Sequence, residues 1–555
     1  MRGSRLKNGF IHNNEQGPRW LGGALLSGVL LGLSFPPVPT GIPAAAAFVP
    51  FFLFGEEKPG YARAFRFSYT AFFVFNLITL YWTGGFTHGK DPYLMAAGSA
   101  LIFAHPLFFF LPVAAWVAIR KRFGPGYSVC LFPFIWVAFE YLHSLTEASF
   151  PWLTLGNTQT YDLTAVQLAA VTGVYGISFW LLWLNVLIYF FVRTLRPPGW
   201  KPFRPGSLVF LGLAIAAYML PKVYGLLVLN RADDSKGVPV RVGIVQPDID
   251  PFEKWGVGAE RQLGILQRLT DSVALEKPDL ILWPETAVPF YILDERNKGS
   301  LAVIRHLVDS LGIPLLTGMP DITYYPEGET APRSSKTLPD GRRYDNYNSS
   351  MLLVPGSDRI QKYAKMLLVP FAERVPFSEQ LSFLNAMQWN FGLGGWGIGK
   401  EKTVFRVKGL QGGSSPGYSF SNFICYESVY PGFVASFVRN GAEFLTVITN
   451  DSWWGNTSGA YQHAQFAVLR AVENRRWVVQ CANGGISCVV DPWGRLLDPT
   501  EMYTRRANTE TVRAIKELTF YSQSGDWFAE MCLILSSFHL AAALGAGLYS
   551  RMRRT

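Results

Sequence analysis

The chain has 555 residues, of which 49% are hydrophobic, 15% aromatic and only 16% charged, with a formal net charge of +10. This length exceeds one ordinary domain, so at least two folding units are expected. The basic residues recur in short clusters between apolar runs, which argues against a nucleic-acid partner and points to a membrane. Five scattered cysteines and seven histidines without ligand spacing predict no disulfide framework, no metal site and no cofactor.

Seven apolar segments precede residue 230, and each approaches the roughly 20 residues that a membrane-spanning helix needs. The second of them is short and flanked by prolines. The segments are Trp20–Phe35, Ile42–Phe54, Phe65–Thr83, Tyr93–Ile119, Tyr127–Leu145, Ala165–Val192 and Leu208–Leu229, and an eighth is Ala529–Tyr549. We therefore predict a membrane domain with seven spans over residues 1–230 and a C-terminal transmembrane helix over residues 529–549.

The basic residues alternate between successive loops, as the positive-inside rule requires when eight spans are counted. One set of loops is rich in lysine and arginine, whereas the alternate short loops carry only Lys90. Both termini are then cytoplasmic, and the large region after the seventh span lies outside the cytoplasm. A cleaved signal peptide is the alternative for the first segment, but its loss would break the alternation.

The region between Val238 and Ser522 is mixed in polarity and contains short β-branched runs between helical patterns. Strands that alternate with helices indicate a layered α/β domain, which we place at residues 238–522. The predicted strands are Val240–Val245, Leu280–Trp283, Leu315–Gly318, Ser350–Val354, Phe423–Cys425, Phe444–Thr449, Trp477–Cys481 and Ser487–Val490. The predicted helices are Glu260–Ala274, Leu301–Leu311 and Ala460–Arg475.

Three junctions between a strand and a loop carry reactive side chains: Glu285 follows Leu-Trp-Pro, Lys365 precedes Met-Leu-Leu-Val-Pro, and Cys425 precedes Tyr-Glu. A thiol with an ordinary pKa of about 8.5 is a poor nucleophile unless a base or a cation assists it. A carboxylate can take its proton, and an ammonium can stabilise the oxyanion that forms on a carbonyl. Taken singly, these residues also fit a buried core thiol, a helix cap and a solvated charge.

The same motifs resemble the nitrilase, or carbon–nitrogen hydrolase, superfamily, which places a Glu–Lys–Cys triad in these contexts. Seven spans, an external nitrilase-like domain and a final span further resemble the bacterial apolipoprotein N-acyltransferases. Stretches that support the resemblance are Phe150-Pro-Trp-Leu, Val245-Gln-Pro, Asn450-Asp-Ser-Trp-Trp-Gly, Gln462-His463, Arg470-Ala-Val-Glu473 and Asn483-Gly-Gly-Ile-Ser. The resemblance implies a polytopic α-helical membrane domain with eight spans joined to an αββα sandwich.

The resemblance also implies a reaction. Cys425 would attack an acyl ester of a phospholipid to form a thioester, and the amine of an apolipoprotein's diacylglyceryl-cysteine would then accept the acyl chain. Glu285 would be the general base and Lys365 the oxyanion stabiliser. Four further residues match positions that the family uses around the site: Glu373, Tyr426, Glu427 and Trp255. The expected enzyme is a monomer in the bacterial inner membrane with a periplasmic catalytic domain.

Two rival functions remain at this point. A membrane-anchored amidase would share the triad and hydrolyse a small amide, although the match in the membrane half argues against it. A transporter would need ionisable groups inside its spans, whereas here only Glu140 and Lys222 stand within apolar segments, near their ends. Outside the triad, we interpret His463 as structural and Glu473 with Arg476 as an i,i+3 pair on a helix.

Overall fold

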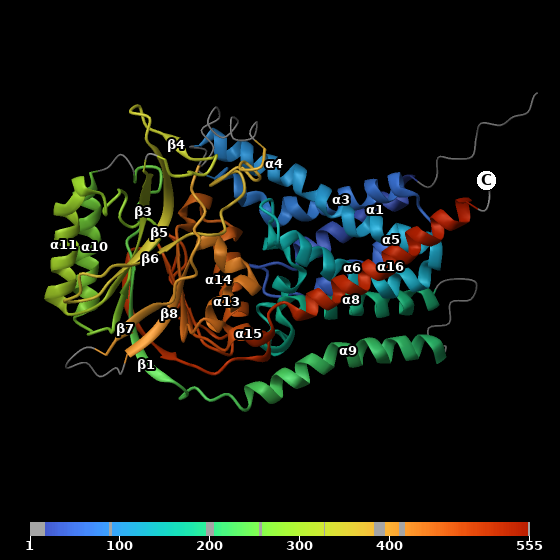
Figure 1. Cartoon of the computed structure of the whole chain (residues 1–555). Coiled ribbons are helices and arrows are strands. Elements are labelled where there is room, and N and C mark those ends of the chain that lie inside the picture. Colours follow the sequence, from blue (N-terminus) through green and yellow to red (C-terminus); the bar gives the residue numbers. More distant parts are fainter. Residues whose placement is uncertain are drawn as a thin grey trace, which may run out of the picture.

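The computed structural model describes residues 17–87, 91–195, 205–254, 258–326, 328–381, 395–409 and 417–552. A bundle of apolar helices forms one end of the molecule and a sandwich of two sheets forms the other (Figure 1). The bundle contains α1 (Gly17–Gly32), α2 (Val49–Gly55), α3 (Tyr61–Leu80), α4 (Pro92–Phe108), α5 (Phe110–Phe123), α6 (Pro125–Ser144), α7 (Leu163–Val166), α8 (Ala169–Thr194), α9 (Pro205–Leu229) and α16 (Trp527–Met552).

Five helical stretches in the described ranges are long and apolar enough to cross a membrane: Pro92–Phe123, Pro125–Ser144, Ala169–Thr194, Pro205–Leu229 and Trp527–Gly547. The protein is therefore membrane-embedded. The helices Trp20–Gly32 and Ile42–Gly55 are apolar but shorter. The number of eight spans thus stays a prediction.

Two of the predicted apolar segments are broken in the structure. The segment Tyr93–Ile119 forms α4 and α5, which meet at Phe109. Proline has no backbone N–H and clashes with the carbonyl four residues before it, so Pro112 interrupts the helix at Phe108. The segment Ala165–Val192 forms α7 and α8, and α8 is kinked at Gly173, whose φ of 66° suits glycine.

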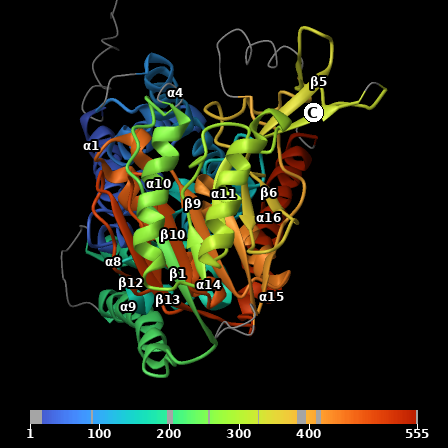
Figure 2. The ribbon, with the colours of Figure 1, turned by 90° about the vertical axis from the view of Figure 1, so that its left-hand side faces the viewer.

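The sandwich has four layers, α–β–β–α, which confirms the expected fold class (Figures 1 and 2). The first sheet has the order β13-β1-β2-β3-β5-β4, with β6 paired to β5. Its strands are β1 (Val238–Gln246), β2 (Leu280–Leu282), β3 (Leu315–Tyr325), β4 (Lys336–Thr337), β5 (Arg343–Leu353), β6 (Gln361–Ala364) and β13 (Arg506–Ala514). The second has the order β12-β11-β10-β9-β8-β7. Its strands are β7 (Phe405–Lys408), β8 (Gly417–Ile424), β9 (Phe444–Thr449), β10 (Val478–Ala482), β11 (Cys488–Val490) and β12 (Leu496–Leu497).

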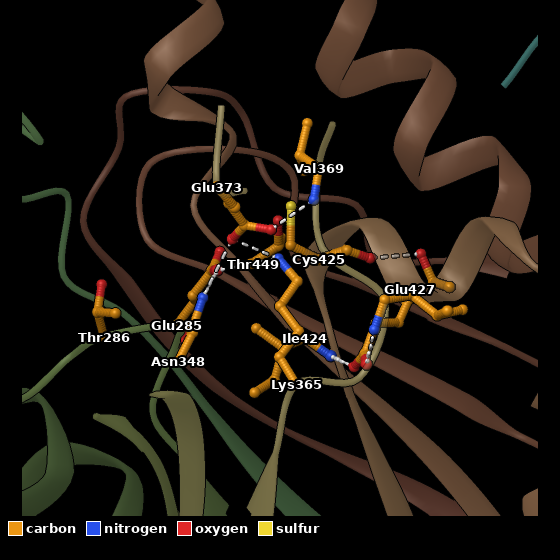
Figure 3. A network of polar contacts seen from close by, with 12 residues as sticks. Glu285, Thr286, Asn348, Lys365, Val369, Glu373, Ile424, Cys425, Glu427 and Thr449 are labelled. Carbon is orange, nitrogen blue, oxygen red and sulfur yellow. Dashed lines mark hydrogen bonds and ion pairs between the residues drawn. The ribbon is translucent and has the colours of Figure 1, made fainter. Parts of the chain in front are cut away.

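Parallel pairing joins β1 to β2 and β2 to β3 in the first sheet, and β8 to β9 and β9 to β10 in the second. The carboxyl ends of parallel strands lie at one edge of each sheet. The residues after β2 and β8, on the two stacked sheets, lie close together in the sandwich (Figure 3). Helices α10 (Ala259–Ala274) and α11 (Lys298–Leu311) cover the outer face of the sandwich. Helices α13 (Pro431–Arg439) and α14 (Ser458–Asn474) lie between the second sheet and the helical bundle (Figure 1).

A single side chain of α14 joins the sandwich to three parts of the bundle. The Gln462 Oε1 atom accepts hydrogen bonds from the indole nitrogens of Trp82, at 3.1 Å, and Trp152, at 2.7 Å. Its amide nitrogen donates to the carbonyl oxygens of Pro36 and Thr79. Gln462 is buried, and all four of its hydrogen-bonding positions are used across this contact.

A buried ion pair makes a second connection between α14 and the bundle, and it corrects one prediction. Glu473 pairs with Arg470, at 2.8 Å, and not with Arg476. Its other carboxylate oxygen accepts from the backbone nitrogen of Val174, which the kink at Gly173 leaves without a helical partner. Arg476 lies beyond the end of α14 and donates to backbone carbonyls instead, because the helix stops at Asn474.

Candidate active site

Cys425 is the first residue after β8 and opens a short 3-10 helix, Cys425–Val429. The sequence predicted it as the last residue of the strand. Its φ of 52° is in the left-handed region, which a side chain other than glycine adopts only where the surroundings enforce it. The buried Glu427 carboxylate enforces the turn by accepting from the backbone nitrogens of Ile424 and Met366 and from the Tyr363 hydroxyl.

Lys365 follows β6, and its backbone nitrogen donates to the Asn348 carbonyl on β5 at 2.8 Å. Its side chain is buried, and its Nζ lies 2.7 Å from Glu373 Oε1 and 3.8 Å from Glu285 Oε1. Figure 3 shows the side chains of Glu285, Lys365, Glu373 and Cys425 converging on one point. One ammonium therefore lies between two carboxylates, next to the thiol.

Glu285 follows β2 in a turn that packs against β3. A Cβ on Gly318 would lie 2.8 Å from the Glu285 Cα and 2.5 Å from the Thr286 nitrogen, so only glycine fits there. The Glu285 Oε1 atom accepts a 2.7 Å hydrogen bond from Asn348 Nδ2, which also reaches Glu373 at 3.4 Å. Asn348 thus sets the distance between the two carboxylates.

The electrostatics suit a thiol that gives its proton to Glu285. Burial raises the pKa of Glu285 above its ordinary value, although Lys365 acts in the opposite direction. Burial and the Glu285 charge raise the pKa of Cys425, which Lys365 partly offsets. Burial acts to lower the pKa of Lys365, but Glu373 and Glu285 outweigh it and the pKa is raised. Lys365 is therefore a permanent cation, and Cys425 is a neutral thiol until Glu285 accepts its proton.

The residue after the nucleophile contacts the helical bundle. The Tyr426 hydroxyl donates to the Ser149 carbonyl at 2.9 Å, and the Tyr430 and Ser149 hydroxyls are 2.6 Å apart. Ser149 belongs to the loop that follows α6. A cleft of about 60 Å³ runs between this loop and the segment after Lys365, and its lining residues are Thr146, Glu147, Ser149, Met366, Leu367, Leu368, Arg374, Pro376, Ile398 and Tyr430.

Two family models match the chain. Residues 27–187 match the apolipoprotein N-acyltransferase N-terminal domain, and residues 241–512 match the carbon–nitrogen hydrolase domain. The apolipoprotein N-acyltransferase of Chlorobaculum tepidum is 39% identical over 92% of this chain and 93% of its own. The enzyme of the same name from Geobacter metallireducens is 32% identical over 92% of each chain. The chain belongs to the apolipoprotein N-acyltransferase family.

Among solved structures, Saccharomyces cerevisiae Nit3 of the nitrilase superfamily is 17% identical, with a TM-score of 0.35, over 50% of this chain and 90% of its own. The first family model covers most of the helical bundle, and the second covers the sandwich. The resemblance found in the sequence is therefore confirmed at the level of the family.

The structure brings together six of the seven site residues expected from the sequence. Glu285, Lys365, Cys425 and Glu373 form one cluster, while Tyr426 and Glu427 hold the turn that carries the thiol. Trp255 lies outside the described residues.

Two further residues were missed in the sequence. Asn348 bridges the two carboxylates, and no sequence pattern pointed to it, because β5 carries several other polar residues, such as Asn346 and Ser349. Lys254 is almost fully buried, and its Nζ donates to the Glu285 carbonyl at 3.1 Å and to the Thr286 hydroxyl at 2.8 Å. Burial lowers the pKa of Lys254 to about 7, with Glu285 acting in the opposite direction. No pattern in the sequence distinguishes Lys254 from a solvated lysine.

In the described part of the chain, one group of side chains has the donor types of a metal site: Cys425, Asp451 and His463, with ligand atoms within 4.8 Å of one another. Both ring nitrogens of His463 already have protein partners, however. Nothing else about this group points to a metal ion. The absence of a metal and of a cofactor therefore stays a prediction.

Proposed function

We propose that this chain transfers an acyl chain from a membrane phospholipid to the N-terminal amine of a diacylglyceryl-apolipoprotein, through a thioester on Cys425. The observation that carries the proposal is the cluster of a thiol, an ammonium and two carboxylates, next to which a cleft lies between the segment after Lys365 and the membrane bundle. A small-amide hydrolase would not need that cleft, so the amidase alternative has less support.

In the first half-reaction, Glu285 takes the thiol proton as the Cys425 sulfur attacks the ester carbonyl. The Lys365 ammonium stabilises the negative charge that develops on the carbonyl oxygen. The ester bond breaks, Glu285 returns the proton to the departing lysophospholipid oxygen, and a thioester remains. In the second half, the acceptor amine attacks the thioester, Glu285 takes an amine proton, and the sulfur leaves and is reprotonated. Glu373 keeps the Lys365 ammonium in position.

A bilayer location follows from the substrates. Each lipid methylene exposed to water costs about 0.8 kcal/mol, so the acyl chain must reach the thiol without leaving an apolar environment. The proposed arrangement is a seven-span domain over residues 1–230, a catalytic domain over residues 238–522 and a final helix over residues 529–549. In the inner membrane, the basic loops would face the cytoplasm and the catalytic domain the periplasm, with a single copy of the chain sufficient for the reaction.

The test is incubation of the purified full-length protein with phospholipid carrying a labelled acyl chain, followed by hydroxylamine. We expect a label on Cys425 that hydroxylamine removes and that Cys425→Ala lacks. Addition of a diacylglyceryl-peptide should move the label to the peptide amine. Equally fast labelling of Cys425→Ala, or a label that resists hydroxylamine, would rule out the thioester.

A further inference from the structure

A second polar network contacts the backbone of the nucleophile. His463 on α14 is fully buried, and its Nδ1 lies 3.0 and 3.2 Å from the two carboxylate oxygens of Asp451. Its Nε2 lies 2.9 Å from the Ser428 hydroxyl and 3.2 Å from the backbone carbonyl oxygen of Cys425. The imidazole therefore connects a buried carboxylate to the backbone of the residue that carries the thiol.

The order Ser–His–Asp is that of a serine hydrolase triad, but the geometry points to another role. The Ser428 side chain is almost fully buried, and its hydroxyl donates to the Cys425 carbonyl at 2.8 Å. A hydroxyl directed at a backbone carbonyl inside the turn does not face a substrate. Ser428 is therefore part of the support of the turn and not a second nucleophile.

The partners of the ring fix its protonation state. A carboxylate and a backbone carbonyl can only accept hydrogen bonds, so Nδ1 donates to Asp451 and Nε2 donates toward Cys425. The Ser428 hydroxyl uses its own hydrogen for the same carbonyl, so its oxygen can only accept from Nε2. A histidine that donates from both nitrogens is an imidazolium. In a neutral ring with its hydrogen on Nδ1, the Cys425 carbonyl loses the Nε2 donor, and the unprotonated Nε2 has no donor unless Ser428 turns its hydrogen away from that carbonyl.

The surrounding charges agree with this assignment. The titratable groups that face the ring are Asp451, from the 3-10 helix Asp451–Trp454, together with Cys425 and Glu285. Burial acts to lower the pKa of His463, but the charge and the hydrogen bond of Asp451 outweigh it, and the pKa lies above its ordinary value. The rings of Trp152 and Trp454 pack nearby, at 5.7 and 6.1 Å between centroids, and keep water from the pair.

We propose that His463 is held as an imidazolium between the Asp451 carboxylate and the Cys425 carbonyl, where it positions the nucleophile and balances the Asp451 charge beside the sulfur. The inference rests on the proposed role of Cys425 as nucleophile. His463 touches no reacting atom in this arrangement, so it is a positioning residue. Without it, an unpaired Asp451 carboxylate would remain within 4.8 Å of the sulfur and oppose formation of the thiolate.

The experiment measures alkylation of Cys425 by iodoacetamide in the purified full-length protein, at a series of pH values, with the modified peptide quantified by mass spectrometry. In His463→Gln the rate-against-pH curve should move to higher pH by about one unit, which is about tenfold slower alkylation near neutrality. The double variant His463→Gln with Asp451→Asn removes the unpaired charge, so its curve should move most of the way back to that of the wild type. An unchanged curve in the single variant, or an equal shift in the double variant, would overturn the proposal.

Two further measurements keep the test decisive if the buried histidine variant misfolds. In Ser428→Ala the Nε2–H still reaches the Cys425 carbonyl, so the curve should move less than in His463→Gln; an equal shift would assign the effect to the hydroxyl. Nitrogen NMR of histidine-labelled wild-type protein should show both His463 ring nitrogens protonated at neutral pH, and a neutral tautomer would refute the imidazolium. Because alkylation needs no lipid, these results are independent of the thioester test.

Discussion

The sandwich and the bundle treat buried polar groups differently. In the sandwich, buried charges are collected into close pairs around the nucleophile, such as Lys365 with Glu373 and His463 with Asp451. In the bundle, Asn185 is a fully buried neutral residue whose amide accepts from the Phe48 nitrogen and donates to backbone carbonyls. At Asn185, neutral hydrogen bonds hold the helices together, whereas the charges around Cys425 lie where a proton and an oxyanion must be handled.

The largest expected effect comes from removing the cation of the site. Lys365→Met should lower the rate of acyl-enzyme formation by about 1,000-fold, because the oxyanion loses its ammonium and two carboxylates are left to repel one another. The measurement is single-turnover labelling of Cys425. The matched control is Lys362→Met, three residues earlier on β6, whose side chain is 48% exposed and pairs with Asp321; its rate should stay within about twofold of wild type. A Lys365→Met variant as fast as this control would remove Lys365 from the mechanism.

The next effect tests the neutral hydrogen bonds of the bundle. Asn185→Leu removes the partners of the Phe48 nitrogen and the Ala44 carbonyl, which should cost about 1–3 kcal/mol of stability. Thermal unfolding in detergent should therefore begin at a lower temperature, while the turnover of the folded protein stays unchanged. The control is Leu220→Ala on α9, at a side chain that is 72% exposed. A large fall in turnover without a fall in stability would mean that the bundle takes part in the chemistry.

The smallest effect concerns Lys254, the buried lysine that donates to the backbone carbonyl of Glu285. Since burial lowers the pKa of Lys254 to about 7, its side chain is charged on the acid side of neutrality, where it lowers the pKa of Glu285. Lys254→Met should raise the pKa of Glu285, so the acid limb of the kcat/KM profile should move to higher pH by less than about one unit. The exposed Lys298→Met on α11 should leave the profile in place. A shift to lower pH would contradict the assigned sign.

Much of the sandwich could be predicted from the sequence, because its central strands are buried on both faces and appear as short apolar runs. Val240–Val245 lies within β1, and Phe444–Thr449 is β9. The missed strands are at the edges: β13 is largely polar, and its place is set by antiparallel pairing with β1. The helix α13 was missed as well. Pairing partners far apart in sequence leave little local pattern, so tertiary contacts decide such elements.

The candidate site was predictable where chemistry restricts residue type, as at Glu285, Lys365 and Cys425. Of the residues that act through others, Glu373, Tyr426 and Glu427 were expected only from the family resemblance. Asparagine, lysine and histidine occur in many contexts, so only the folded neighbourhood assigns Asn348, Lys254 or His463 a role. The Glu473–Arg476 pair was wrong for a related reason. Both i,i±3 partners of Glu473 are arginines, and the end of α14 at Asn474 decides which one lies within reach.

The Gln462 amide has one further consequence. All of its hydrogen bonds are made to the membrane bundle. It nevertheless lies one residue before His463, on a helix that belongs to the sandwich. Deletion of the membrane helices would leave that amide without its hydrogen-bond partners and would expose the surface that now contacts two indole rings. A water-soluble derivative would therefore need a redesigned α14 as well as a shorter chain. The inner helix of the sandwich, more than any linker, keeps the catalytic domain at the membrane.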